Sequence, residues 1–74
     1  MVEPDQQPAI SQVVFRTLPL LQQATLLWTS GTLLASRWEG QQAVGLYQLG
    51  DFYCELFYDT TTYALLRTRI VPAR

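Results

Sequence analysis

Histidine and lysine are both absent from this chain of 74 residues, and charged residues make up only 15% of it. Because histidine is the commonest general base and metal ligand, the usual acid–base and triad chemistry lacks its main residue here. Ser11, Ser30 and Ser36 have no recognisable activating partner, and no glycine-rich phosphate loop, HExxH or CxxC spacing occurs. We therefore predict a protein that is not an enzyme and that holds no cofactor and no metal.

Carboxylates at a regular spacing are the one pattern that could indicate acid–base chemistry or a hard cation. Asp51, Glu55 and Asp59 recur every four residues. On a strand, however, the two aspartates fall at opposite ends with Glu55 between them, which is too dispersed for a shared metal. We interpret the aspartates as turn residues and Glu55 as one member of a cross-strand pair.

Charge of either sign is scarce, with a net charge of −1 and five basic residues that are all arginine. Such a chain has no overall basic field that would attract nucleic acid or an anionic membrane. Its charged fraction is below the roughly 25% of a typical soluble domain, so fewer groups keep a lone small domain in solution. The composition favours association, and we predict a homo-oligomer or a protein partner.

Cysteine occurs once, at Cys54, so neither an intramolecular disulfide nor a multi-cysteine metal site is expected. We expect this thiol to face inward as a small apolar residue. The amino-terminal residues are acidic and polar, unlike a signal peptide, and no apolar run is long enough to span a bilayer. These features predict a cytoplasmic protein.

The length gives room for one domain that buries roughly 60–65% of its unfolded-chain surface. Residues 1–10 combine two prolines, two glutamines and two acids, which is typical of a disordered lead-in. We assign residues 11–74 to a single α+β domain. Residues 11–16 (SQVVFR) fit either a first strand or the opening turn of a helix, and the sequence leaves both open.

A helix is predicted over about residues 18–30. Thr17 is placed to act as its N-cap, Pro19 lies in its first turn and Gly31 follows it as a stop. The apolar residues recur at helical spacing and predict one inward face, with Leu26 outlying and exposed; they are Leu20, Leu21, Ala24, Leu27 and Trp28. The alternative is a hairpin with a strand at 25–29 and a turn at Ser30-Gly31.

Four strands are predicted, over about residues 32–39, 43–49, 52–59 and 63–71, because β-branched and aromatic residues alternate with short turn signals. Gly50-Asp51 fits a type II′ hairpin turn, which places Leu49 opposite Phe52 and Tyr47 opposite Cys54. The turn after Asp59 contains no glycine and leaves the register open. A three-residue loop at 60–62 would set Glu55 opposite Arg67 and keep the uncharged residues together.

This register predicts a sheet face without charge, which we assign to the core. The face comprises Ala43, Gly45, Tyr47, Leu49, Phe52, Cys54, Leu56, Tyr58, Ala64, Leu66, Thr68 and Ile70. The predicted architecture is one amphipathic helix packed on a four-stranded antiparallel β-meander. One helix covers only one face of such a sheet.

The second face carries enough apolar residues to predict an interface. Its proposed contact residues are Val44, Leu46, Tyr53, Glu55, Phe57, Leu65, Arg67 and Arg69, flanked by Gln48 and Tyr63. A two-residue loop in the first hairpin would add Leu33, Ala35 and Arg37. The alternative is that the helix covers this second face, so that the apparent patch is core and residues 9–16 partly cover the other face.

A nucleic-acid interpretation is the main alternative to a protein interface. Tyr53, Phe57 and Tyr63 could stack bases, and Arg67 and Arg69 could hold phosphates. No RNP-like motif accompanies them, and aromatic residues are favoured on strands in any case. We therefore expect a non-catalytic protein–protein interaction module or assembly subunit, with a single-stranded nucleic-acid-binding sheet domain as the alternative.

Three segments in roughly the last 45 residues follow a structural pattern that is not a catalytic signature. GTLLASR at 31–37, VGLYQLGDFYCELFYD at 44–59 and RTRI at 67–70 resemble a pattern in small uncharacterised bacterial proteins. That pattern reads G-T-x-L-A-x-R, then L-Y-x-L-x-x-F-x-x-E-x-x-Y-D, then I-R near the end. It implies a bacterial source and carries no activity that could be transferred.

Overall fold

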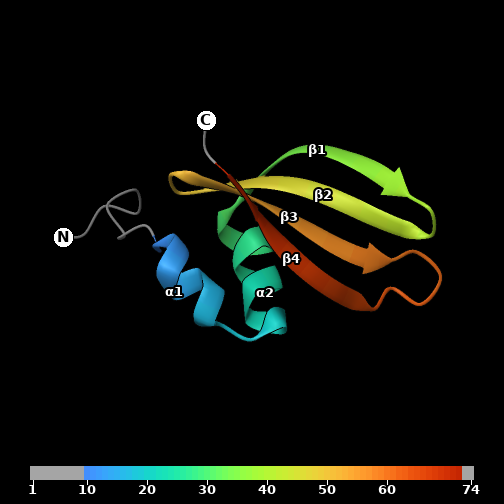
Figure 1. Cartoon of the computed structure of the whole chain (residues 1–74), viewed down its shortest axis with the longest axis horizontal. Coiled ribbons are helices and arrows are strands. Elements are labelled where there is room, and N and C mark those ends of the chain that lie inside the picture. Colours follow the sequence, from blue (N-terminus) through green and yellow to red (C-terminus); the bar gives the residue numbers. More distant parts are fainter. Residues whose placement is uncertain (1–9, 73–74) are drawn as a thin grey trace.

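The computed structural model describes residues 10–72, and the predicted α+β architecture is confirmed (Figure 1). Within these residues the chain forms two helices followed by four antiparallel strands in the order β1-β2-β3-β4, which is a meander. Most of the predicted lead-in, residues 1–9, lies outside the described residues. The elements are α1 (Gln12–Thr17), α2 (Leu20–Ser30), β1 (Thr32–Glu39), β2 (Gln42–Leu49), β3 (Phe52–Asp59) and β4 (Leu65–Val71).

Residues 12–17 form the short helix α1, which decides the question left open for 11–16. The Ser11 hydroxyl accepts a hydrogen bond from the Val14 amide at 3.1 Å and so caps the amino terminus. Leu18 is extended, as expected for a residue before proline, and it separates the two helices. Thr17 therefore belongs to the last turn of α1, and its predicted role as the N-cap of the second helix is wrong.

The long helix α2 begins at Leu20, with Pro19 at the N-cap position and no side-chain cap. Its buried residues are Gln23, Ala24 and Leu27, so the inward face is rotated from the predicted one. The predicted inward residues Leu21 and Trp28 are 64% and 53% exposed. Leu26, predicted to be exposed, packs partly buried against the core.

Gln23 explains the rotation of α2. Its Nε2 donates to the Phe15 carbonyl at 2.8 Å, and its Oε1 accepts from the Thr68 hydroxyl at 2.6 Å. With both ends of the amide satisfied, this polar side chain is buried without an unpaired group and links α1, α2 and β4. An analysis of hydrophobic periodicity treats glutamine as a residue that faces solvent, and it therefore assigns the wrong inward face to α2.

The first two hairpins have two-residue loops, as predicted for Gly50-Asp51 and as the sequence left open for the first hairpin. Gly40 and Gly50 both have a φ of +60° whereas Asp51 does not, as a type II′ turn requires. The predicted pairing of Leu49 with Phe52 is confirmed. In β1, however, a bulge at Leu34 sets Leu33 opposite Tyr47, which places Leu33 on the helix side of the sheet rather than on the second face.

The third hairpin differs from the prediction because its loop is five residues long, 60–64. The Asp59 carboxylate accepts hydrogen bonds from the Thr61 and Thr62 amides at 2.7 and 2.9 Å, and Tyr63 adopts a left-handed φ of +60°. The longer loop moves β4 by two residues relative to β3. Glu55 therefore lies opposite Arg69, and the predicted pairing of Glu55 with Arg67 is wrong.

A register irregularity accompanies this shift. Tyr58 lies opposite Leu65, which places Leu65 on the helix side, and not on the second face as predicted. Leu66 and Ala64, assigned to the core face, are exposed. Thr68 and Ile70 keep their predicted face, because a shift of two residues preserves the alternation of a strand.

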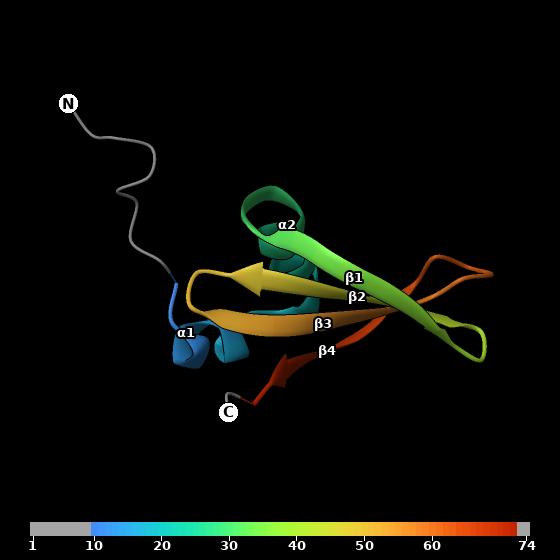
Figure 2. The same cartoon turned by 90° about the horizontal axis from the view of Figure 1, so that it is seen from above.

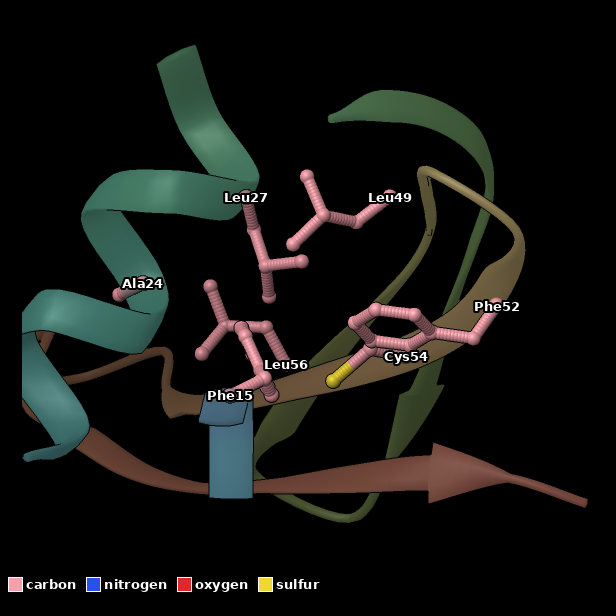
Figure 3. Packing of buried hydrophobic residues seen from close by; sticks show 7 residues of the cluster. All are labelled: Phe15, Ala24, Leu27, Leu49, Phe52, Cys54 and Leu56. Atoms are coloured by element: carbon pink, nitrogen blue, oxygen red, sulfur yellow. The ribbon is translucent and has the colours of Figure 1, made fainter. Parts of the chain in front are cut away.

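The core lies between the helices and one half of the sheet (Figure 3). Its buried residues are Phe15, Ala24, Leu27, Leu49, Phe52, Cys54 and Leu56. The predicted core face is thus the one under the helix. Both helices lie beneath the half of the sheet that contains the β2–β3 turn, whereas the β1–β2 turn and the β3–β4 loop extend beyond them (Figures 1 and 2). Within residues 10–72, no helix has the length and apolar character needed to cross a membrane.

Candidate interaction surfaces

The open face, meaning the sheet face away from the helices, was the predicted interface. It brings most of the predicted residues together, but they are not a bare apolar patch. Val44 and Phe57 are each 1% exposed, and Glu55 is 6% exposed. Leu46 is half-buried and Tyr53 is exposed, while Leu65 lies on the opposite side.

Arginine side chains cover the centre of the open face. We call Arg37, Arg67 and Arg69 the arginine layer. The Arg67 guanidinium lies 3.8 Å from the centroid of the Phe57 ring, and that of Arg37 lies 5.9 Å from it. Arginine stems cover apolar surface while their charged groups stay in water, and the guanidinium is attracted by the ring. The aromatic ring predicted to face a partner is therefore already covered by side chains of its own chain.

Glu55 holds the arginine layer in place. Its carboxylate accepts from Arg69 Nε at 2.9 Å and from Arg37, which also pairs with Glu39 at 2.6 Å. Burial alone would raise the pKa of the Glu55 carboxyl, but the hydrogen bonds from Arg37 and Arg69 outweigh burial and lower it. The pKa of Arg37 is raised by its hydrogen bonds to Glu39 and Glu55. Among the described residues, the acids form no cluster that could hold a metal ion.

A second surface, on the helix side, is apolar and open. Trp28, Tyr47, Tyr58, Tyr63 and Leu65 line a hollow of about 500 Å³, which we call the aromatic hollow. It lies between α2 and the part of the sheet that extends beyond the helices. Burial raises the pKa of the Tyr47 hydroxyl. The five residues include no charged side chain.

Two residues of β1 extend the aromatic hollow towards the edge of the sheet. Leu33 lies opposite Tyr47, and Trp38 lies opposite Ala43, which itself pairs with Tyr58, so both face the helix side. Leu33 is 55% exposed, Trp38 72% and Tyr63 77%. We call the hollow together with Leu33 and Trp38 the aromatic shelf.

The sequence did not reveal the aromatic shelf for identifiable reasons. Trp28 was assigned to the helix–sheet core, and Tyr63 and Leu65 to the open face. The long third loop, with the irregularity beside it, moves Leu65 across the sheet, and the bulge at Leu34 does the same for Leu33. A bulge leaves no signal in a pattern of alternating residues.

Another hollow, of about 330 Å³, is polar. It is lined by Phe15, Arg16, Gln23, Thr68 and Ile70. Gln23 and Thr68 hydrogen-bond to each other, and within residues 10–72 every buried side-chain nitrogen or oxygen has a partner. The buried polar atoms of the lining therefore offer no unpaired group to a ligand, and we assign no function to this hollow beside the α1–α2 junction.

Cys54 faces the core, as predicted, and is fully buried. Burial raises the pKa of its thiol to about 11. A thiol with so high a pKa is almost entirely protonated near neutrality and is a poor nucleophile.

No protein-family model matches the chain, and no curated protein or solved structure is detectably similar to it. The interpretation of its surfaces therefore comes from their geometry and chemistry.

Proposed function

We propose that this chain is a non-catalytic protein–protein interaction module or assembly subunit, and that the aromatic shelf is its contact surface. One observation carries the proposal. Trp28 and Tyr63 line a single uncharged hollow, Leu33 and Trp38 lie on the same side of the sheet, and all four are 53–77% exposed. Contiguous apolar surface of this kind on a small domain marks an interaction site more often than bare surface.

The size of the surface supports a protein partner. Trp28, Trp38 and Tyr63 are 53–77% exposed. An aromatic side chain buries about 150–250 Å² when it is fully covered, so the exposed parts of these three amount to roughly 300–500 Å². A standard protein interface buries about 800 Å² on each partner. The shelf thus supplies about half of such an interface, and the neighbouring surfaces of α2 and β1 supply area for the rest.

Strand β1 adds backbone groups to the same region. It is an edge strand of the sheet, and all eight of its residues are exposed. Unpaired edges of this length invite pairing with another chain unless charge, proline or a bulge blocks them. The bulge at Leu34 disturbs the first half of β1. In the second half, the charged side chains of Arg37 and Glu39 pair with each other on the open face, so the backbone edge beside Trp38 can still pair with another chain.

The predicted bacterial cytoplasmic setting fits this proposal. A single buried thiol has no need of an oxidising compartment. The resemblance to small bacterial proteins in 31–37 and 44–59 supports the source.

The alternative, binding of single-stranded nucleic acid on the open face, has less support. Tyr53 is 42% exposed there and could stack a base. However, Arg37 and Arg69 are paired with Glu55, and Arg67 covers the ring of Phe57. A bound strand would have to displace both contacts.

Mass measurement tests the proposed function. We expect light scattering to give a mass above the 8.5 kDa of one chain, and Trp38→Glu or Tyr63→Glu to return it to that value. Tyr53→Glu is the matched control, because it places the same charge at an exposed aromatic on the open face. Three results would contradict the proposal. The wild type could be monomeric at every concentration, its mass could fall only with Tyr53→Glu, or its mass could rise only when RNA is added.

A further inference from the structure

The outward side of α2 is an apolar stripe beside the aromatic hollow. Leu21, Thr25 and Trp28 follow one another at i, i+4 and i+7, which places them along one side of a helix. All three are exposed, Leu21 at 64% and Trp28 at 53%. Trp28 also lines the hollow, so the stripe and the aromatic shelf form one continuous surface.

The threonine hydroxyls on this side of α2 need no water molecule as a hydrogen-bond acceptor. Thr25 Oγ1 donates to the Leu21 carbonyl at 2.8 Å, and Thr29 Oγ1 donates to the Thr25 carbonyl at 2.8 Å. Their hydroxyl hydrogens are thus used within the helix, which leaves the methyl groups to face outward. A partner can therefore cover the two threonines without leaving a hydroxyl donor unsatisfied.

The electrostatics of α2 favour an antiparallel helix as its partner. The helix contains no charged residue, with no acid in its first turn and no base in its last. Its end charges, about +0.5 at the amino end and −0.5 at the carboxyl end, are therefore not offset by its own side chains. A second α2 that runs in the opposite direction would set each end beside the opposite partial charge.

The spacing of the stripe makes α2 complementary to itself. Leu21 and Trp28 are seven residues apart, or about 10.5 Å along the axis. In an antiparallel pair, Leu21 of each copy would meet Trp28 of the other, with Thr25 close to the two-fold axis. The small side chain of Thr25 at that position lets two helices approach closely.

From these observations we infer that the partner of the aromatic shelf is a second copy of this chain, and that the two copies meet through antiparallel packing of α2 on α2. The inference rests on the proposed function and specifies its partner and geometry. The contact is isologous, because each copy contributes the same stripe. Leu21 adds its exposed area to that of the shelf residues, which already include Trp28, and so enlarges the surface available to a second copy.

Cysteine cross-linking tests this geometry. In Thr25→Cys the two new thiols face each other near the axis, so mild oxidation is expected to give a covalent dimer of twice 8.5 kDa on a non-reducing gel. Ser30→Cys is the control, because Ser30 is also an exposed residue of α2 but lies about 140° around the helix from Thr25. The buried Cys54 stays out of the reaction.

A pair of charge substitutions provides an independent measurement. Leu21→Glu places a carboxylate against Trp28 of the partner and is expected to raise the dimer dissociation constant about tenfold or more. Gln22→Glu introduces the same charge one residue along, at the side of the stripe, and is expected to change it by less than about threefold.

The outcomes separate this inference from the proposed function. Cross-linking of Thr25→Cys but not Ser30→Cys supports the α2 contact. A wild type that self-associates while Ser30→Cys cross-links better than Thr25→Cys, or while neither cross-links, overturns the α2 contact and leaves the shelf as the contact surface. A wild type that is monomeric at every concentration overturns both.

Discussion

The open face and the aromatic shelf lie on opposite sides of the same sheet, and neither is covered by a helix. On the open face Phe57 is 1% exposed, because Arg67 lies 3.8 Å from its ring centroid and Glu55 holds the neighbouring arginines. On the shelf Trp38 is 72% exposed, and no charged side chain lines the hollow beside it. An apolar sheet face is thus available to a partner only where long side chains of its own chain do not already cover it.

The largest expected difference between the two surfaces is in stability. Phe57→Ala removes a fully buried ring and should lower the free energy of unfolding by about 3–5 kcal/mol, enough to unfold a domain of this size. Trp38→Ala should change it by less than about 1 kcal/mol at low concentration, since most of that ring is in water. Urea unfolding of the two variants checks this, and equal losses would show that the two faces are not distinguished as described.

The next largest effect on the free energy of unfolding is expected at Glu55, whose carboxylate binds two of the arginines on the open face. Glu55→Ala leaves Arg37 and Arg69 without their buried acceptor and should lower the free energy of unfolding by about 1–3 kcal/mol. Glu39→Ala is the control, because Glu39 pairs with Arg37 at the surface, and should cost about 0–1 kcal/mol. If the two substitutions cost the same in urea unfolding, Glu55 does not organise the open face.

The rotation of α2, which leaves Trp28 on the shelf, can be tested at neighbouring glutamines. Gln23→Ala removes the contacts to the Phe15 carbonyl and the Thr68 hydroxyl and should lower the free energy of unfolding by about 1–2 kcal/mol. Gln22→Ala changes an exposed residue and should stay within about 0.5 kcal/mol. A larger loss from Gln22→Ala in thermal or urea unfolding would contradict the observed helix face.

The smallest effect is the dependence of stability on pH that Glu55 gives the open face. Because the folded-state pKa of Glu55 lies below its ordinary value of 4.5, its contribution to stability is present above about pH 4.5. That contribution is lost as the pH falls through the folded-state pKa. The Thr62 and Thr61 amides also lower the pKa of Asp59, so Asp59 contributes to the pH dependence with the same sign as Glu55. This contribution is the same in the wild type and in a variant changed only at Glu55.

Comparison of wild type with Glu55→Gln isolates this effect. The difference in their free energies of unfolding should be largest near neutral pH and should shrink on acidification below pH 4.5. A difference that grows as the pH falls would show that the folded state raises the pKa of Glu55.

The sequence was sufficient to predict the meander and an uncharged core face, but it left open which face the helix covers. Strict alternation across Gly50-Asp51 fixed the pairing of β2 with β3, because a glycine with positive φ defines the loop length. It was not sufficient for the third hairpin. There Asp59 and Tyr63, which has a left-handed backbone conformation, form a five-residue loop that contains no glycine and so gives no sequence signal. The register of β4 against β3 therefore differs from the predicted one by two residues.

The exposure of individual side chains was harder to predict than the fold. Alternation reports which side of a strand a residue faces, but not whether an arginine will lie over it, so Phe57 was taken for a contact residue. Hydrophobic periodicity gave Trp28 an inward position because it cannot anticipate that Gln23 will find two buried partners. Both errors concern side chains with long reach, whose contacts depend on the tertiary structure.

Hydroxyl-radical footprinting of the wild type across a range of concentrations tests most directly the claim that the shelf, and not the open face, is the contact surface. The account predicts that Trp28, Trp38 and Tyr63 become protected as the protein associates, while Tyr53 on the open face stays as reactive as in the dilute protein. Protection of Tyr53 with unchanged reactivity of Trp38 and Tyr63 would contradict it.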